Sequence, residues 1–113
     1  MNNAILTIQN EQLTVQINPS GAELWSIKDK KGCEYLWQGD AAYWSDRAIN
    51  LFPYIARMTE KSYTYQSQVY HMDIHGFAKD SLFEVAEHTS GTLTLKISST
   101  EETLAQYPFA FDF

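Results

Sequence analysis

The segment VYHMDIHGFAKD, residues 69–80, alternates polar and apolar side chains and then reaches a glycine. Successive side chains of a β-strand point to opposite faces, so a strand over 69–75 would have one apolar and one polar face. The apolar face would lie on a core and carry Tyr70, Met72 and Ile74. The polar face would line solvent or a cleft and carry His71, Asp73 and His75. Gly76 predicts a sharp turn, because glycine adopts backbone angles that other residues avoid.

Two other segments have the same period of two, which is typical of half-buried strands. In LTVQI the apolar face is Leu13, Val15 and Ile17, and in LTLKIS it is Leu93, Leu95 and Ile97. Turn-forming residues separate such runs at NPSG (18–21), KKG (30–32) and TSG (89–91). Several short strands at this spacing predict an all-β protein, an antiparallel sandwich or barrel. Residues 1–113 contain no repeat or linker and are interpreted as one segment of a single domain.

One helical signal occurs late in the chain, in SSTEETLAQYP. Ser99 and Glu102 have the spacing of a capping box, and Pro108 is a stop signal. We therefore expect one or two helical turns near 100–106.

The last residues, YPFAFDF, place Phe109, Phe111 and Phe113 on one face of what resembles a strand. One interpretation is an edge strand docked on the core. The other, which we favour, is that the chain is truncated, because domain termini are usually frayed and polar.

The net charge of −6 and a pI near 4.8 argue against nucleic acid or an anionic membrane as partner. Cys33 is the only cysteine, which excludes an internal disulfide and a thiolate zinc cluster. The N-terminus resembles no secretory signal, and no apolar run approaches the ~20 residues of a membrane span. We expect a cytoplasmic protein.

A metal-dependent hydrolase that uses His71, Asp73 and His75 is one alternative, because imidazole and carboxylate bind zinc-like ions. Three ligands on one straight strand would span about 13 Å, however, too far to converge on one ion without a bulge. His88 is the only other histidine. For His71 and Asp73 we favour a solvated strand face, and we expect no metal.

Four motifs carry a resemblance to a known family. GAELWSI (21–27), YLWQGDAAYW (35–44), NLFPYIARM (50–58) and HGFAKDSLFEV (75–85) occur in the order seen in the aldose 1-epimerase, or mutarotase, superfamily. TLAQYPFAFDF at the end resembles the family's next segment, and the LacX-type branch is the most similar. The resemblance implies the N-terminal part of a large antiparallel β-sandwich, the galactose mutarotase-like supersandwich, with a sugar cleft. It also implies interconversion of hexose anomers without a cofactor, by a glutamate base and a histidine acid.

The resemblance assigns substrate-binding roles to Arg57 and His75. Arg57 matches an arginine that contacts sugar hydroxyls, and its fork of donors suits that role. His75 matches the family's first active-site histidine, which holds the sugar near its ring oxygen. The residues alone would suggest a surface ion pair for Arg57 and a structural role for His75. Ala56 stands where galactose-type members often have asparagine, which puts a preference for galactose in doubt.

Lys79 and Arg47 are further candidates, as cations for a phosphorylated sugar, although lysine lacks bidentate geometry. Members with a hexose-6-phosphate substrate commonly have arginine at the position of Lys79.

The resemblance places the catalytic acid and base further along the chain than residue 113. His88 is no substitute, because it is expected at a strand end. We therefore expect the chain to bind part of a hexose without catalysing its reaction, and a non-catalytic carbohydrate-binding module is the alternative. We also expect self-association through exposed sheet surfaces and strand edges.

Overall fold

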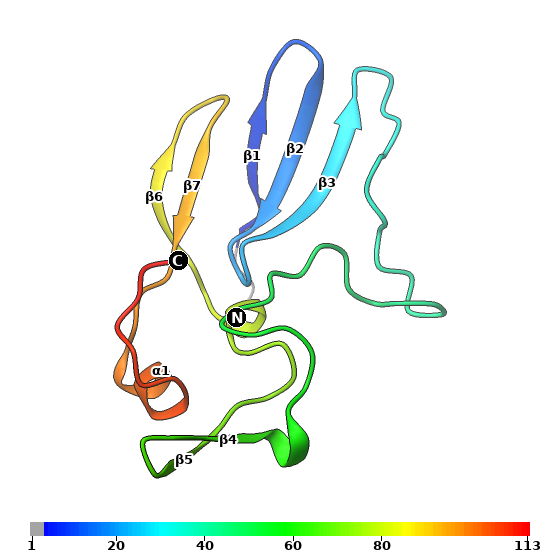
Figure 1. Cartoon of the computed structure of the whole chain (residues 1–113). Helices are drawn as coiled ribbons and strands as arrows, with labels where there is room; N and C mark the ends of the chain where they lie inside the picture. The colour runs from blue at the N-terminus through cyan, green and yellow to red at the C-terminus, as the bar shows by residue number, and fades with distance from the viewer. Residues whose placement is uncertain (1–3) are drawn as a thin grey trace.

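The computed structural model describes residues 4–113 and consists mainly of antiparallel strands (Figure 1). The first sheet contains β1 (Leu6–Gln9), β2 (Leu13–Asn18) and β3 (Glu23–Asp29). Two hairpins are formed by β4 (Ser62–Tyr65) with β5 (Gln68–His71), and by β6 (Glu84–His88) with β7 (Leu93–Lys96). The helical elements are the 3-10 turns η1 (Thr59–Lys61) and η2 (Ala78–Asp80) and the helix α1 (Glu101–Gln106). The prediction of an all-β antiparallel fold with one short helix is confirmed.

The first sheet has the apolar face that its alternation predicts. Val15 lies opposite Ile8 on β1 and Ile27 on β3, and Ile17 lies opposite Leu6 and Leu24. A β-bulge between Gln16 and Ile17 shifts the register without changing the face that Ile17 occupies. A hollow lies between this face and β7, and it is lined by Leu93 and Leu95 together with Ile8, Val15, Ile17, Ala22 and Leu24.

The expected strand over 69–75 is wrong in its second half, because β5 ends at His71. The amide of Met72 donates to the carbonyl of Lys61 (2.9 Å), just before β4 begins, and β5 has no strand partner beyond that point. The chain then turns, and His75 has a left-handed backbone with φ of 65°. His71, Asp73 and His75 therefore do not share a strand face.

Phe52 is the centre of an aromatic cluster. Its ring stacks on Phe113 with centroids 4.6 Å apart, and it meets Phe111 (5.0 Å) and Phe77 (6.0 Å) edge-on. Residues 111–113 run beside 97–99, because the amide and carbonyl of Phe113 both bond to those of Ile97. Phe111 and Phe113 thus pack on the same ring, that of Phe52, whereas Phe109 packs on Tyr65 and Tyr107.

The predicted helix is confirmed, but its cap lies one residue later than expected. Thr100 and Thr103 form the capping box, in place of Ser99 and Glu102. The amide of Ser99 donates to the carbonyl of Phe111 (3.0 Å), so Ser99 belongs to the pairing with the C-terminal segment. Tertiary pairing has decided which of two good N-cap residues begins the helix.

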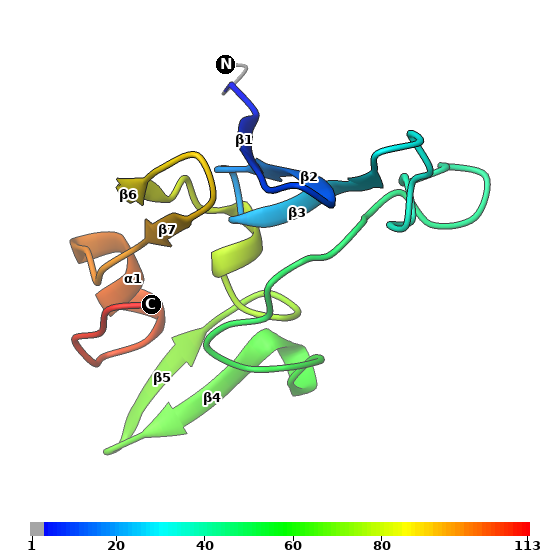
Figure 2. The ribbon, with the colours of Figure 1, turned by 90° about the horizontal axis from the view of Figure 1, so that it is seen from above.

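The three sheets spread around a small core (Figure 2). The radius of gyration is 16.6 Å, whereas a compact domain of this length has one of about 13 Å. The buried apolar side chains of the described residues are Ile17, Met72, Phe77, Ala78 and Phe83. In the described part of the chain, no helix is long and apolar enough to cross a membrane.

Candidate functional site

Two segments far apart in the sequence lie side by side at the site, and Phe52 and Gly76 join them. The carbonyl of Phe52 accepts hydrogen bonds from the amides of Phe77 (2.9 Å) and Ala78 (3.2 Å). Gly76 has φ of 77°, and a Cβ there would come within 2.2 Å of the Phe52 oxygen. Any larger residue at 76 would push the two segments apart, so the glycine is needed for this close approach.

Ala56 and His75 are joined by two hydrogen bonds. The amide of Ala56 donates to Nδ1 of His75 (2.8 Å), and the amide of His75 donates to the carbonyl of Ala56 (2.8 Å). Both residues have left-handed backbones, with φ of 74° and 65°. Such angles are uncommon for residues other than glycine and are concentrated at functional sites.

Tyr54 fastens the same two segments from a third point. Its hydroxyl donates to the carbonyl of Asp73 at 2.7 Å, and the carbonyl of Met72 lies 3.3 Å away. The loop 53–58 is therefore held against 72–76 at both ends, which fixes the backbone position of Arg57 relative to His75.

Arg57 follows Ala56 directly and is exposed. Within residues 4–113, the ion pairs are Lys61–Asp73, Lys79–Asp80 and Lys96–Asp112, and none includes Arg57. The surface ion pair that the residue alone would suggest is thus not formed among the described residues. Arg57 and His75 come from adjacent, fastened segments, and the guanidinium is available to a ligand.

Arg47 and Lys79 are held elsewhere. The Arg47 guanidinium lies 3.9 Å from the centre of the Trp25 ring and donates to the Trp25 carbonyl (2.7 Å) and the Gln38 side chain (2.9 Å). Lys79 Nζ lies 2.9 Å from the Asp80 carboxylate. No contact in the described part of the chain joins either cation to Arg57 or His75.

The residues of the metal hypothesis do not converge. Asp73 is exposed and lies 3.2 Å from Lys61 Nζ, and His71 is exposed at the end of β5. The described residues contain no group of three His, Cys, Asp or Glu side chains arranged around a common point. His88 is at the end of β6, as expected, and its Nε2 lies 2.9 Å from the Thr7 carbonyl.

An apolar hollow of about 280 Å³ lies where these two segments meet β4 and the end of α1. Its lining is Pro53, Tyr54, Met58, Tyr63, Met72 and Tyr107. Burial raises the pKa of the Tyr63 phenol, whose hydroxyl donates to the Gln106 carbonyl at 2.6 Å. This contact attaches α1 to the β4–β5 hairpin.

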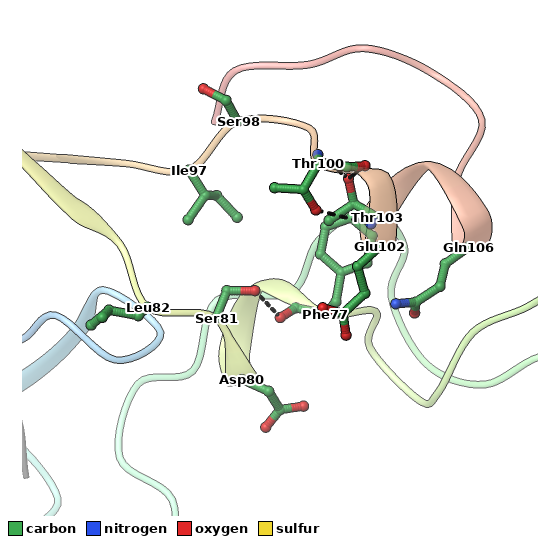
Figure 3. A pocket seen from close by; sticks show the side chains of 10 residues that line it. All are labelled: Phe77, Asp80, Ser81, Leu82, Ile97, Ser98, Thr100, Glu102, Thr103 and Gln106. Atoms are coloured by element: carbon green, nitrogen blue, oxygen red, sulfur yellow. Dashed lines mark hydrogen bonds between the residues drawn. The ribbon is translucent and has the colours of Figure 1, made fainter. Parts of the chain in front are cut away.

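A second hollow, of about 330 Å³, separates η2 from α1 (Figure 3). Its hydroxyl groups are occupied locally: Ser81 donates to the Phe77 carbonyl (2.7 Å), and Thr100 and Thr103 cap the helix. Asp80 and Glu102 are its charged groups, and both are carboxylates. This hollow therefore lacks the cation and imidazole that accompany the Ala56–His75 pair.

Comparison with known proteins shows the family to which the chain belongs. The family model described as "Aldose 1-epimerase" matches residues 4–113. The chain belongs to the aldose 1-epimerase family. It is 35% identical over 112 residues to "Protein LacX, plasmid" of Lactococcus lactis subsp. lactis, covering 95% of this chain and 38% of that protein. The chain thus spans well under half the length of the curated relatives that it matches.

Two solved structures of the family are similar along nearly the whole chain. The galactose mutarotase related enzyme from Lactobacillus acidophilus is 38% identical with a TM-score of 0.93, covering 97% of this chain and 37% of that one. A galactose mutarotase-like protein from Lactobacillus casei is 34% identical with a TM-score of 0.91, covering 96% and 37%.

Two residues of the candidate site were not predicted from the sequence: Tyr54, and Ala56 as a contact of His75. Tyr54 carries no local signal, because its partners are backbone carbonyls. For Ala56 one signal was present. The resemblance places asparagine at this position in galactose-type members, and asparagine is enriched at the left-handed angles that Ala56 adopts.

Proposed function

We propose that Arg57 and His75 hold an aldose, and that a full-length protein of this family containing this segment acts on the anomeric carbon of that sugar, as an aldose 1-epimerase. The observation that carries the proposal is the fastening of the Ala56–Arg57 segment to His75 in a chain of this family. Arginine presents five N–H donors in a fixed fork, which fits two neighbouring hydroxyl oxygens. An imidazole beside it adds a further polar contact, and Tyr54 keeps the loop between them in place.

In the proposed reaction a carboxylate base removes the proton of the anomeric hydroxyl as the bond between C1 and the ring oxygen breaks. An acid protonates the ring oxygen, and the resulting aldehyde rotates about its C1–C2 bond. Reclosure on the other face reverses both proton transfers and gives the other anomer. No atom is gained or lost. In this scheme Arg57 and His75 bind and orient the sugar. The resemblance assigns the acid and the base to segments of the family's proteins that this chain does not cover.

For the 113 residues alone, we propose binding of an aldose without catalysis. Support comes from the share of the relatives that the chain covers, 37–38%, together with the presence of both sugar-holding residues. A carbohydrate-binding module without catalytic function is the second candidate, favoured by the same two residues. The two proposals differ in whether the whole protein exchanges anomers.

The experiment has two arms, with D-glucose and D-galactose as probes. In the first, the ¹⁵N spectrum of the chain is recorded during titration, and the Arg57 side-chain and His75 amide signals should shift saturably. Arg57→Ala should weaken the effect at least tenfold, whereas Lys30→Ala, in an exposed turn, should leave it unchanged. No saturable shift with either sugar would refute sugar binding.

In the second arm, anomer exchange is followed by NMR. The chain alone should not exceed the spontaneous rate. A clear acceleration that Arg57→Ala abolishes would contradict the proposal that these residues bind without catalysing.

We also propose that the chain associates with itself through the first sheet. Leu13 and Leu24 are 38% and 40% exposed, and β1 and β3 are the outer strands of that sheet. Unpaired strand edges and apolar faces favour association. Light scattering should show a dimer or larger species at micromolar concentration, and Leu24→Glu should shift it towards the monomer. A sharp monomer peak for the unmodified chain would contradict this.

A further inference from the structure

The contact between Ala56 and His75 determines which ring nitrogen faces a ligand. Nδ1 of His75 accepts the hydrogen bond of the Ala56 amide at 2.8 Å. A backbone amide can only donate, so Nδ1 must present its lone pair. In the neutral imidazole the proton then resides on the other nitrogen, because the two ring nitrogens have opposite roles.

The second hydrogen bond makes this arrangement rigid. The His75 amide donates to the Ala56 carbonyl at 2.8 Å, so backbone and ring are held by the same residue. The left-handed backbones of both residues bring these groups face to face. The strain of two such angles is tolerated where the surroundings fix them, here through Gly76 and Tyr54.

We propose that Ala56 is a positioning residue, whose backbone amide selects the tautomer of the His75 imidazole that carries its proton on Nε2. No group of residues 4–113 bonds to Nε2, so that N–H is free to donate. Arg57, the next residue in the chain, also offers only donors. The side chains of Arg57 and His75 therefore present donors alone, and they select a ligand through its acceptor oxygens.

This description of the ligand rests on the proposed function, but the tautomer does not. A ligand face with several oxygen lone pairs is favoured, and one whose only polar groups are N–H donors is rejected. A side chain that acts as a base towards the ligand must therefore come from outside the loop 53–58 and His75.

The tautomer is tested without a sugar, on the uniformly ¹⁵N-labelled chain. Long-range ¹H–¹⁵N spectra should show His75 with a pyridine-like Nδ1 and a protonated Nε2. A scalar coupling across the hydrogen bond should connect the Ala56 amide nitrogen to Nδ1. His71 has no side-chain hydrogen bond in the described part of the chain and should give averaged ring shifts. An averaged spectrum for His75, or a proton on Nδ1, would overturn the inference.

Three variants separate positioning from ligand contact. Ala56→Gly keeps the amide and accepts the backbone angle, so the coupling should persist. His75→Asn places an acceptor near the position of Nδ1 and tolerates a left-handed backbone, so the Ala56 amide proton should stay protected from exchange. His75→Gly tolerates the same angle without any acceptor, and protection should be lost. Equal protection in the Asn and Gly variants would contradict the proposed role.

Measuring sugar affinity separates the role of Ala56 from the proposed sugar binding. His75→Asn lacks a donor at the position of Nε2, so titration with D-glucose or D-galactose should show affinity at least tenfold below that of the unmodified chain. His75→Gln restores a donor there and should recover part of the loss. If the coupling is seen but neither sugar binds, the proposed function fails and the inference about Ala56 stands. If a sugar binds but the coupling is missing, the reverse holds.

Discussion

The carbonyl oxygen of Phe52 lies 2.2 Å from the point where a side chain on Gly76 would begin. That oxygen accepts hydrogen bonds from the amides of Phe77 and Ala78, so this contact between the two site segments depends on residue 76 having no Cβ. Arg57 and His75, which we propose hold the sugar, belong to these two segments.

Replacing Gly76 by alanine should therefore weaken the junction by about 3 kcal/mol, from a left-handed alanine and an overpacked contact. Hydrogen exchange of the Phe77 and Ala78 amides should become about a hundredfold faster. Gly32→Ala is the matched control, because Gly32 has φ of 82° but no atom within 4 Å of the point that a Cβ would occupy. Similar effects from both substitutions would mean that the close approach to Phe52 contributes nothing.

Ala56→Gly should have the opposite effect and increase the stability of the folded chain. Alanine at φ of 74° is strained, and glycine relieves that strain, so we expect a gain of about 1 kcal/mol. Ala105→Gly, within helix α1, should instead cost about 1 kcal/mol, because glycine is a poor helix former. Thermal unfolding of the two variants should thus shift in opposite directions. A lowered midpoint for Ala56→Gly would show that the methyl group is needed.

The helix cap provides a test between neighbouring residues. Thr100→Ala should reduce the stability of α1 by about 1 kcal/mol, because the Thr100 hydroxyl accepts the Thr103 amide at 3.1 Å. Ser99→Ala should have little effect, since the contact of Ser99 with Phe111 uses its backbone. Chemical shifts of residues 101–106 report the helix directly. A larger loss for Ser99→Ala would restore the cap expected from the sequence.

Lowering the pH should loosen the segment that follows β3, because protonation of Glu34 weakens the hydrogen bonds that its carboxylate accepts. The Ser26 hydroxyl, followed by the Ile27 and Leu36 amides, holds the pKa of the Glu34 carboxyl below its ordinary value of 4.5. A lowered pKa in the folded state means that the stabilisation is present above about pH 4.5 and is lost as the pH falls through the lowered value. The Leu36 amide signal should follow this transition.

Glu34→Gln is the variant for this experiment, because glutamine keeps one acceptor and cannot titrate. The acid-dependent change at Leu36 should disappear in it. Glu11→Gln, whose side chain makes no hydrogen bond in the described residues, should leave the change in place. An unchanged acid transition in Glu34→Gln would rule out this carboxylate as its source.

Local patterns predicted the strands well where the partner strand runs their full length. Leu93 and Leu95 alternate as expected on β7, and Val15 and Ile17 do so on β2. The alternation of 69–75 predicted too long a strand, because the partner strand of β5 extends no further than Lys61. The local sequence does not show where a partner strand ends. The predicted position of the helix cap was wrong for a similar reason. Ser99 and Thr100 are equally good N-cap residues, and only the pairing of Ser99 with Phe111 decides between them.

The sequence named Arg57 and His75 as candidate site residues, but it did not predict the backbone contacts that join their segments. Arg57 and His75 came from motifs, and the structure puts their segments together. The contact that fixes the imidazole uses the backbone of an alanine, and an alanine side chain gives no indication of φ or of a hydrogen bond. Long-range backbone contacts of this kind require coordinates.

The small core has a consequence for how the chain unfolds. Among the described residues only five apolar side chains are buried, and of these only Ile17 belongs to a strand, so the three sheets have little buried surface in common. The dependence of stability on denaturant scales with the surface that unfolding exposes. In urea the chain should therefore melt over a broad concentration range with a shallow slope, and the aromatic cluster around Phe52 should outlast the β6–β7 hairpin.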